Sequence, residues 1–284
     1  MRQFLYRNLQ IYFKDKATVF YSLIGTLMIF ALYVLFLGNL WSTMYKDVQN
    51  SSQLVDSWVM AGILSVVSIT STAGALGIMV NDKSTKISKD FYSSPVKKSH
   101  IAGGYVLCAA IVGLIMSFIM LALAEAYIVS RGGELLGFTS FIKVIGLIAI
   151  VSLSNTSVMI FFASFFRSHN AYTSAAGIVG SLIGFIAGAY IPIGMFPKGI
   201  QMVLEPLPVF QASALLREAM MGSLLQTSLS TMSQNEISEF YYMFGISTRV
   251  GNYSIPSMIS FIILIATFII FLSLSAWNLA KKEQ

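Results

Sequence analysis

The chain has 284 residues, of which 56% are hydrophobic and only 11% are charged. Soluble domains carry roughly 25% charged residues, so this composition excludes a protein that is surrounded by water on all sides, and lipid is its expected solvent. The net charge of +6 comes from basic residues in short tracts between apolar runs, which argues against a nucleic-acid partner, and the single cysteine excludes an intramolecular disulfide and a cysteine-based metal cluster.

The segment 1–16 is predicted to form an amphipathic helix that lies in the inner membrane interface. Leu5, Leu9 and Tyr12 would share one helical face, and Arg7 falls on another. The alternative is an unstructured basic tail. The apolar run that follows is too long for the core of a signal peptide, so we expect it to stay as a membrane anchor.

Six apolar stretches without charged residues are long enough to cross a bilayer, which takes about 20 residues. Because unsatisfied backbone groups are costly in lipid, each stretch should be a helix. The sequence therefore predicts an all-α polytopic membrane protein with one transmembrane domain, residues 1–284. The expected spans are 17–41, 57–81, 101–124, 144–166, 170–192 and 254–280.

The distribution of Lys and Arg predicts that both chain ends lie in the cytoplasm. With the N-terminus inside, twelve of the 18 basic residues fall on the cytoplasmic side, and the other six are spread over much longer outer segments. This bias is the positive-inside pattern.

The loop after the second span is the most charged part of the chain. Asp82 is expected to cap a short helix in this loop, and Ser94 with Pro95 is expected to start the third span. Apolar residues are interleaved with the lysines, so docking onto a partner protein and anchoring to lipid are both open. The candidate contact residues are Asp82, Lys83, Lys86, Ile87 and Phe91.

The tract 193–253, between the fifth and sixth spans, is rich in proline and then in polar residues. An apolar patch at 209–216 is too short to cross the membrane, so we expect a re-entrant or interfacial pair of helices at the outer surface, followed by a small external cap. The residues singled out in and just before this tract are Pro192, Pro206, Pro208, Arg217 and Glu218.

Residue patterns that indicate an enzyme or an ion-driven carrier are missing. There is no GxxxxGK[ST] phosphate loop, no catalytic residue and no metal ligand set that we would assign, and His100 and His169 are expected to be surface residues. Glu125 and Lys143 lie near the outer ends of their spans, where snorkelling towards the headgroups is the favoured interpretation over a coupling role. No cofactor is expected in this chain.

Small and polar residues mark three of the spans. Glycines at GxxxG spacing allow helix backbones to approach closely, which suits either packing within the chain or a seam between two copies. The polar residues could likewise serve internal packing or line a substrate path. The glycines are Gly180, Gly184 and Gly188, and the polar residues are Ser65, Ser68, Thr72 and Asn155.

Three segments together resemble the permease subunit of ABC-2 type transporters. They are the basic interfacial segment before the first span, the stretch 91–98 that begins Phe91-Tyr92-Ser93-Ser94-Pro95, and the run from Gly188-Ala189-Tyr190-Ile191-Pro192 through Pro206-Leu207-Pro208 to Leu216-Arg217. The resemblance covers essentially the whole chain.

This resemblance implies a second permease copy or a paralogue, and a separate cytoplasmic ABC ATPase that holds ATP and Mg. It implies that the loop at 82–91 couples to that ATPase, that Gly180, Gly184 and Gly188 contribute to the dimer seam and path, and that the helices near 206–217 gate the exit.

The function expected from the sequence is export of an amphipathic substrate, such as a toxin, antibiotic or lipid-like molecule, through the cytoplasmic membrane of a bacterium. An ATPase-independent carrier or channel and a non-transporting immunity or sensor protein are the alternatives. The expected partners are the ATPase, the second permease and membrane lipid, with no nucleic acid.

Overall fold

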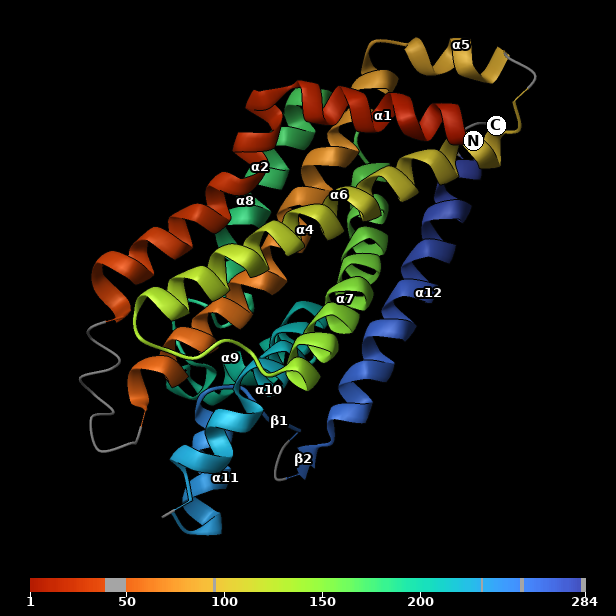
Figure 1. Cartoon of the computed structure of the whole chain (residues 1–284). Helices are drawn as coiled ribbons and strands as arrows, with labels where there is room; N and C mark the ends of the chain where they lie inside the picture. Colours follow the sequence, from red (N-terminus) through yellow and green to blue (C-terminus); the bar gives the residue numbers. More distant parts are fainter. Residues whose placement is uncertain (39–49, 94–95, 231, 251–252, 282–284) are drawn as a thin grey trace.

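The computed structural model describes residues 1–38, 50–93, 96–230, 232–250 and 253–281 (Figure 1). Ser94 and Pro95, expected to begin the third span, lie outside the described residues. The elements that precede residue 193 are α1 (Arg2–Lys14), α2 (Lys16–Leu32) with a π-helical continuation (Tyr33–Leu37), α4 (Ser51–Ser84), α5 (Ile87–Ser93), α6 (Lys98–Ser130), α7 (Phe138–Ser164) and α8 (His169–Ile186). The last helix of the chain is α12 (Ser257–Lys281).

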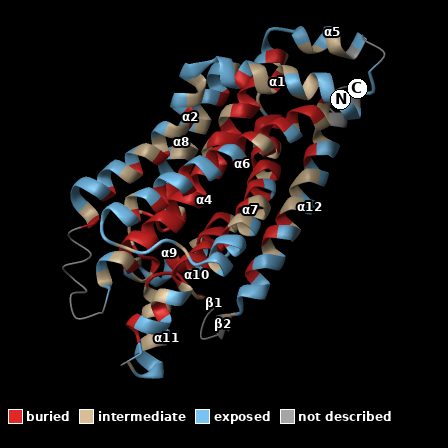
Figure 2. Ribbon diagram, viewed as in Figure 1, coloured by how far each residue is buried: buried red, intermediate tan, exposed pale blue. Residues whose placement is uncertain are grey.

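The long helices form a bundle around α4, which packs against α2, α6, α7, α8 and α10. Almost every residue of α4 from Leu54 to Val80 is buried, as Figure 2 shows by its red ribbon. The helix carries serine and threonine side chains such as Ser65, Ser68 and Thr72 that are buried against its neighbours rather than exposed to lipid. The outer helices keep exposed apolar faces, for example Phe20 and Met28 of α2 and Ile269 of α12, as expected for surfaces that meet lipid.

Five helices of the described part are long and apolar enough to cross a membrane, namely α2 with its continuation, α4, α6, α7 and α12. The helix in the place of the expected fifth span, α8, is shorter than the predicted range 170–192. It begins with polar residues and is followed by Gly188, whose φ of 64° turns the backbone away from the helical direction. The all-α, multi-pass architecture is thus observed, and the count of six spans stays a prediction.

The helices extend beyond the charge-free runs because charged residues near their ends have partners within the chain. Asp56 of α4 accepts a hydrogen bond from Tyr33 and lies 3.8 Å from Arg131. At the other end of α4, Asp82 is held by Arg7. A paired carboxylate can lie in a helix end that the sequence pattern assigns to a loop.

Both chain termini, α1 and α5 lie at one end of the bundle, and α9, α10, α11 and the β-hairpin lie at the other (Figure 1). This arrangement agrees with the prediction that the two ends of the chain share one side. The side of the membrane on which they lie stays a prediction.

The outer region predicted at 193–253 is an ordered set of short elements. They are a 3-10 turn (Ile193–Met195), α9 (Lys198–Leu204), α10 (Pro208–Ser228), α11 (Gln234–Met243) and the antiparallel pair β1 (Thr248–Val250) and β2 (Tyr253–Ile255). The apolar patch at 209–216 is only the first part of α10, which has 21 residues and inserts against α4, α7 and α12. The helices α9 and α10 lie in the tract where a re-entrant or interfacial pair was expected, and their place relative to the membrane stays a prediction. The sequence did not predict the hairpin.

Candidate functional site

The end of the bundle that holds α1 and α5 carries a cluster of five side chains that we call the clasp: Phe4 and Arg7 of α1, Asp82 of α4, Phe91 of α5 and Tyr105 of α6. Arg7 donates to both carboxylate oxygens of Asp82 at 2.8 and 3.1 Å, and Tyr105 donates to the same carboxylate at 2.6 Å. Three separate helices, α1, α4 and α6, therefore meet at one carboxylate.

Aromatic contacts attach α5 to this ion pair. The Phe91 ring lies edge-on to Phe4 with centroids 5.1 Å apart, and the Arg7 guanidinium lies 4.9 Å from the Phe91 ring centre. Phe4 also meets Tyr105 edge-on, at 5.0 Å. Such contacts contribute about 0.5–1.5 kcal/mol each, so a seven-residue helix that could not persist alone is fixed to the bundle.

The clasp is an unequal ion pair, because the side chain of Asp82 is 3% exposed and that of Arg7 is 31% exposed. The hydrogen bonds from Arg7 to Asp82 raise the pKa of Arg7 above its ordinary value, so the guanidinium is charged at any physiological pH. The buried carboxylate depends on Arg7 and Tyr105 for its compensation.

The clasp corrects one expectation from the sequence and adds one contact. Asp82 does not cap the short helix, because α4 continues through it to Ser84 and α5 begins only at Ile87. Arg7 was expected only to lie on a different face of α1 from Leu5, Leu9 and Tyr12, and its guanidinium pairs with Asp82. Sequence periodicity cannot show that a basic residue has a buried partner 75 positions away.

The other predicted contact residues differ in what they face. Ile87 is 38% exposed at the start of α5, while Phe91 is half-buried and holds α5 to the bundle. Lys86 is exposed and adopts a φ of 65° between α4 and α5, and the half-buried Lys83 lies in the last turn of α4. Ile87 is therefore the apolar side chain that a partner can reach.

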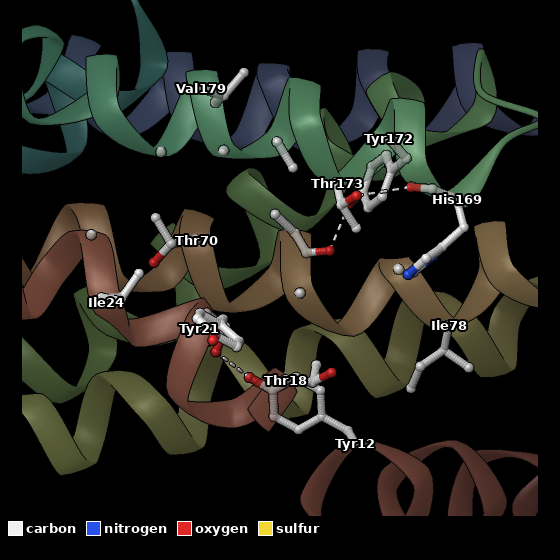
Figure 3. Close-up of a pocket in the computed structure, with 18 of the residues that line it drawn as sticks. Tyr12, Thr18, Tyr21, Ile24, Thr70, Ile78, His169, Tyr172, Thr173 and Val179 are labelled. Carbon is white, nitrogen blue, oxygen red and sulfur yellow. Dashed lines mark hydrogen bonds between the residues drawn. The ribbon is translucent and has the colours of Figure 1, made fainter. Parts of the chain in front are cut away.

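A cavity of about 870 Å³ lies beside the clasp, between α1, α2, α4 and α8 (Figure 3). Small residues of α4 make room for it, since Gly74 and Gly77 line it together with Thr70. Arg7 and Asp82 also line it, so the clasp forms part of its wall.

Polar groups in the cavity wall are mostly satisfied within the chain. Tyr12 and Ser22 share a hydrogen bond of 2.7 Å, and Tyr172 donates to the backbone oxygen of Ala73 at 2.6 Å. His169 contributes a ring Nδ1 that is buried and has no hydrogen-bond partner among the described residues. The wall thus combines apolar surface with a few hydroxyl groups and one imidazole, which suits an amphipathic molecule.

The four polar residues predicted to line a path do not line this cavity. Ser65, Ser68, Thr72 and Asn155 are fully buried where α4 meets α6 and α7, and the Asn155 amide reaches the Ser65 backbone oxygen at 3.4 Å. Packing within the chain was one of the two alternatives and agrees with this burial, although Ser68 Oγ and Asn155 Oδ1 have no hydrogen-bond partner among the described residues. A role of the four residues in lining a path stays a prediction.

The three predicted seam glycines also have contacts inside the chain. A Cβ atom at Gly180 would come within 3.7 Å of the Thr70 side chain of α4, and one at Gly184 would come within 2.4 Å of the Tyr190 ring. Gly188 follows α8 in the left-handed region. The large apolar side chains exposed on α8 are Ile178, Leu182 and Phe185. A role of the glycines in a seam stays a prediction.

The residues predicted for an outer gate lie around the α9–α10 pair. Pro192 precedes the 3-10 turn, Pro206 lies between α9 and α10, and Pro208 is the first residue of α10. Glu218 is exposed. The structure brings these residues to the end of the bundle opposite the clasp (Figure 1).

Arg217 is fully buried and has no carboxylate partner among the described residues. Its guanidinium donates to the backbone oxygens of Ala187 and Gly188 at 2.8 and 2.9 Å, and it stacks on Trp58 with a distance of 5.0 Å to the ring centre. It ties the end of α8 to α10 and α4, an internal role that the sequence did not show.

The cavity is the part of the site that sequence reasoning missed. A signal was present, because Thr70, Gly74 and Gly77 repeat at helical spacing along one face of α4 and leave it without bulk. The contribution of Tyr172 and His169 from α8 had no signal, since it depends on how two helices pack.

Comparison with known proteins adds one result. A family model described as ABC-2 family transporter protein matches residues 41–277. No curated protein matches the chain. The matched range contains α4 to α8, the outer region and most of α12, whereas α1 and α2 precede it.

Proposed function

This chain belongs to the ABC-2 transporter family, and from that premise we propose that it is the permease subunit of an exporter that is driven by a separate cytoplasmic ABC ATPase. The family is one of multi-pass membrane transport subunits rather than enzymes. Beyond the family itself, the proposal specifies the partner, the direction of transport and the class of cargo.

The observation that carries this proposal is the attachment of α5 to the helix bundle through Phe91. Phe91 fixes α5 to the clasp, and Ile87 remains exposed at the end of the bundle where the basic loops lie. A partner that pushes on Ile87 would move α5, α1 and the inner ends of α4 and α6 together, because Arg7 and Asp82 join them. Such a link can convert closure of an ATPase dimer into movement of helices.

The proposed cargo is amphipathic. The cavity beside the clasp has mainly apolar walls. Of its charged lining residues, Arg7 and Asp82 pair with each other, and the exposed Asp15 caps the start of α2. A second permease, identical or paralogous, would complete the path along the exposed faces of α2 and α8. ATP and Mg would be bound by the ATPase, and the expected location is the cytoplasmic membrane of a bacterium.

The alternatives from the sequence, an ATPase-independent carrier or channel and an immunity or sensor protein, are not favoured by the family match. They remain outcomes of the test.

The test is to express the chain together with the ABC ATPase encoded next to it, purify the complex and reconstitute it in vesicles. We expect ATP hydrolysis that rises when amphipathic cargo is added, and ATP-dependent movement of that cargo across the vesicle membrane. Transport that continues after the ATPase is removed would favour the carrier, and an absence of transport with intact ATP hydrolysis would favour the sensor.

The variant Ile87→Asp separates coupling from insertion. It places a charge on the exposed start of α5. Because Ile87 also lines the cavity beside the clasp, cargo binding is measured separately without ATP. A loss of coupling predicts normal membrane insertion and normal cargo binding, with cargo-stimulated hydrolysis at the basal rate. Ile87→Leu keeps the apolar contact and should keep stimulation. Normal stimulation in Ile87→Asp would remove α5 as the coupling element.

A further inference from the structure

A second, smaller cavity lies between α6 and α7 at the end of the bundle opposite the clasp. Its volume is about 370 Å³, within the range of small-molecule sites. One face of α6, one face of α7 and the loop between them form its walls. The lining residues are Phe118, Leu121, Ala122 and Glu125 of α6, Phe141 and Ile145 of α7, and Leu135 and Leu136 of the loop.

Glu125 supplies the one charged group of this otherwise apolar lining. The residue is 8% exposed, and its Oε2 accepts a hydrogen bond from the backbone nitrogen of Leu136 at 3.0 Å. Its Oε1 is buried and has no hydrogen-bond partner among the described residues. Snorkelling, the interpretation favoured from the sequence, is therefore wrong for Glu125, because the loop folds over the carboxyl group.

Among the described residues, no basic side chain forms an ion pair with Glu125. Arg131 lies 3.8 Å from Asp56, and the side chain of Lys143 is exposed. A carboxylate oxygen in apolar surroundings is costly unless a donor or a cation reaches it. Phe118 and Phe141 line the same space, and aromatic rings attract ammonium groups.

We propose that this cavity is a binding site for an amphipathic cation, that is, a primary ammonium group on an apolar tail or ring. The ammonium group donates to Oε1 of Glu125, and the apolar part lies along Phe118, Leu121 and Phe141. The same chemistry is available from the headgroup of an ethanolamine lipid and from a free amphipathic amine. The site does not depend on the proposed function, since binding requires neither the ATPase nor transport.

The test is equilibrium binding to the purified chain in dodecyl maltoside micelles, with dansylcadaverine as the probe. This molecule has a primary ammonium group and an apolar fluorescent ring whose emission shifts to the blue in an apolar site. Empty micelles provide the background. The variant Glu125→Gln keeps the shape and one acceptor for Leu136, and it removes the charge.

We expect Glu125→Gln to raise the Kd at least about tenfold, because a charge-assisted hydrogen bond is lost. The matched control is Glu134→Gln, which removes the same charge from an exposed side chain of the same loop and should leave the Kd unchanged within about twofold. Ala122→Phe fills the cavity without changing any charge and should weaken binding as well.

Binding to Glu125→Gln as tight as to the natural chain would overturn the proposal, and so would an equal loss in Glu134→Gln. Undiminished binding to Ala122→Phe would place the probe elsewhere and also overturn it. Competition by added phosphatidylethanolamine, with none by phosphatidylglycerol, assigns the site to a lipid headgroup. An absence of competition by either lipid assigns it to a free amine.

Discussion

The clasp predicts an energetic coupling between Arg7 and Asp82, which a double-mutant cycle of the free energy of unfolding can measure. Arg7→Met keeps the alkyl stem against Phe91 but removes both hydrogen bonds to Asp82. It leaves a 3% exposed carboxylate that still accepts a hydrogen bond from Tyr105. Removing one partner of a fully buried pair costs roughly 3–5 kcal/mol. Because Arg7 is partly exposed and the hydrogen bond from Tyr105 remains, we expect Arg7→Met to lower the free energy of unfolding by about 2–3 kcal/mol.

Asp82→Asn should cost less, about 1 kcal/mol, because the Arg7 guanidinium can be hydrated and still stacks on Phe91. The double variant should cost about 1–2 kcal/mol less than the sum of the single ones. The assay is equilibrium unfolding by sodium dodecyl sulfate from dodecyl maltoside micelles, followed by circular dichroism. Strictly additive costs, or a larger cost for Asp82→Asn than for Arg7→Met, would refute the unequal ion pair.

Two further predictions concern the end of α8. Gly188→Ala should lower the free energy of unfolding by about 1–2 kcal/mol, because the φ of 64° at this position disfavours a Cβ atom. The control Gly146→Ala, in open space on α7, should be neutral or stabilising. Equal effects in the two variants would contradict the role of Gly188. Arg217→Lys should cost about 2 kcal/mol or more in the same unfolding assay, since a lysine cannot present a planar fork whose Nη2 reaches Ala187 and Gly188 while Nη1 reaches Gly245. A change below about 0.5 kcal/mol would show that the guanidinium does not hold this end together.

The sequence predicted the class of fold because lipid imposes strong rules on composition. Charge-free runs located α4, α6, α7 and α12 and the start of α2, and the Lys and Arg bias placed both termini at one end. The predicted lengths of the spans were less accurate. Each predicted span ends at the first charged residue, whereas α4 continues past Asp56 and Asp82 because both carboxylates have partners within the chain. The early end of α8 at a left-handed glycine was also not evident from an apolar run.

The candidate site was predicted in part. Ile87 and Phe91 were both found as apolar residues among lysines, but only the packing shows that Phe91 faces Phe4 while Ile87 remains exposed. Polar residues in a span suggested a path, yet the Asn155 amide donates to the backbone oxygen of Ser65, and the Ser65 hydroxyl donates to Gly62 of its own helix. A residue type indicates that a polar group needs a partner, and only the tertiary structure decides whether that partner is protein or cargo.

The most direct test of the account is photocrosslinking from position 87 in cells that also express the neighbouring ABC ATPase. With p-benzoylphenylalanine in place of Ile87, the account predicts a covalent adduct with the ATPase, and the same substitution at the outer residue Met202 should give none. An adduct from Met202 but not from position 87, or no adduct at position 87 while ATPase-dependent transport persists, would contradict it.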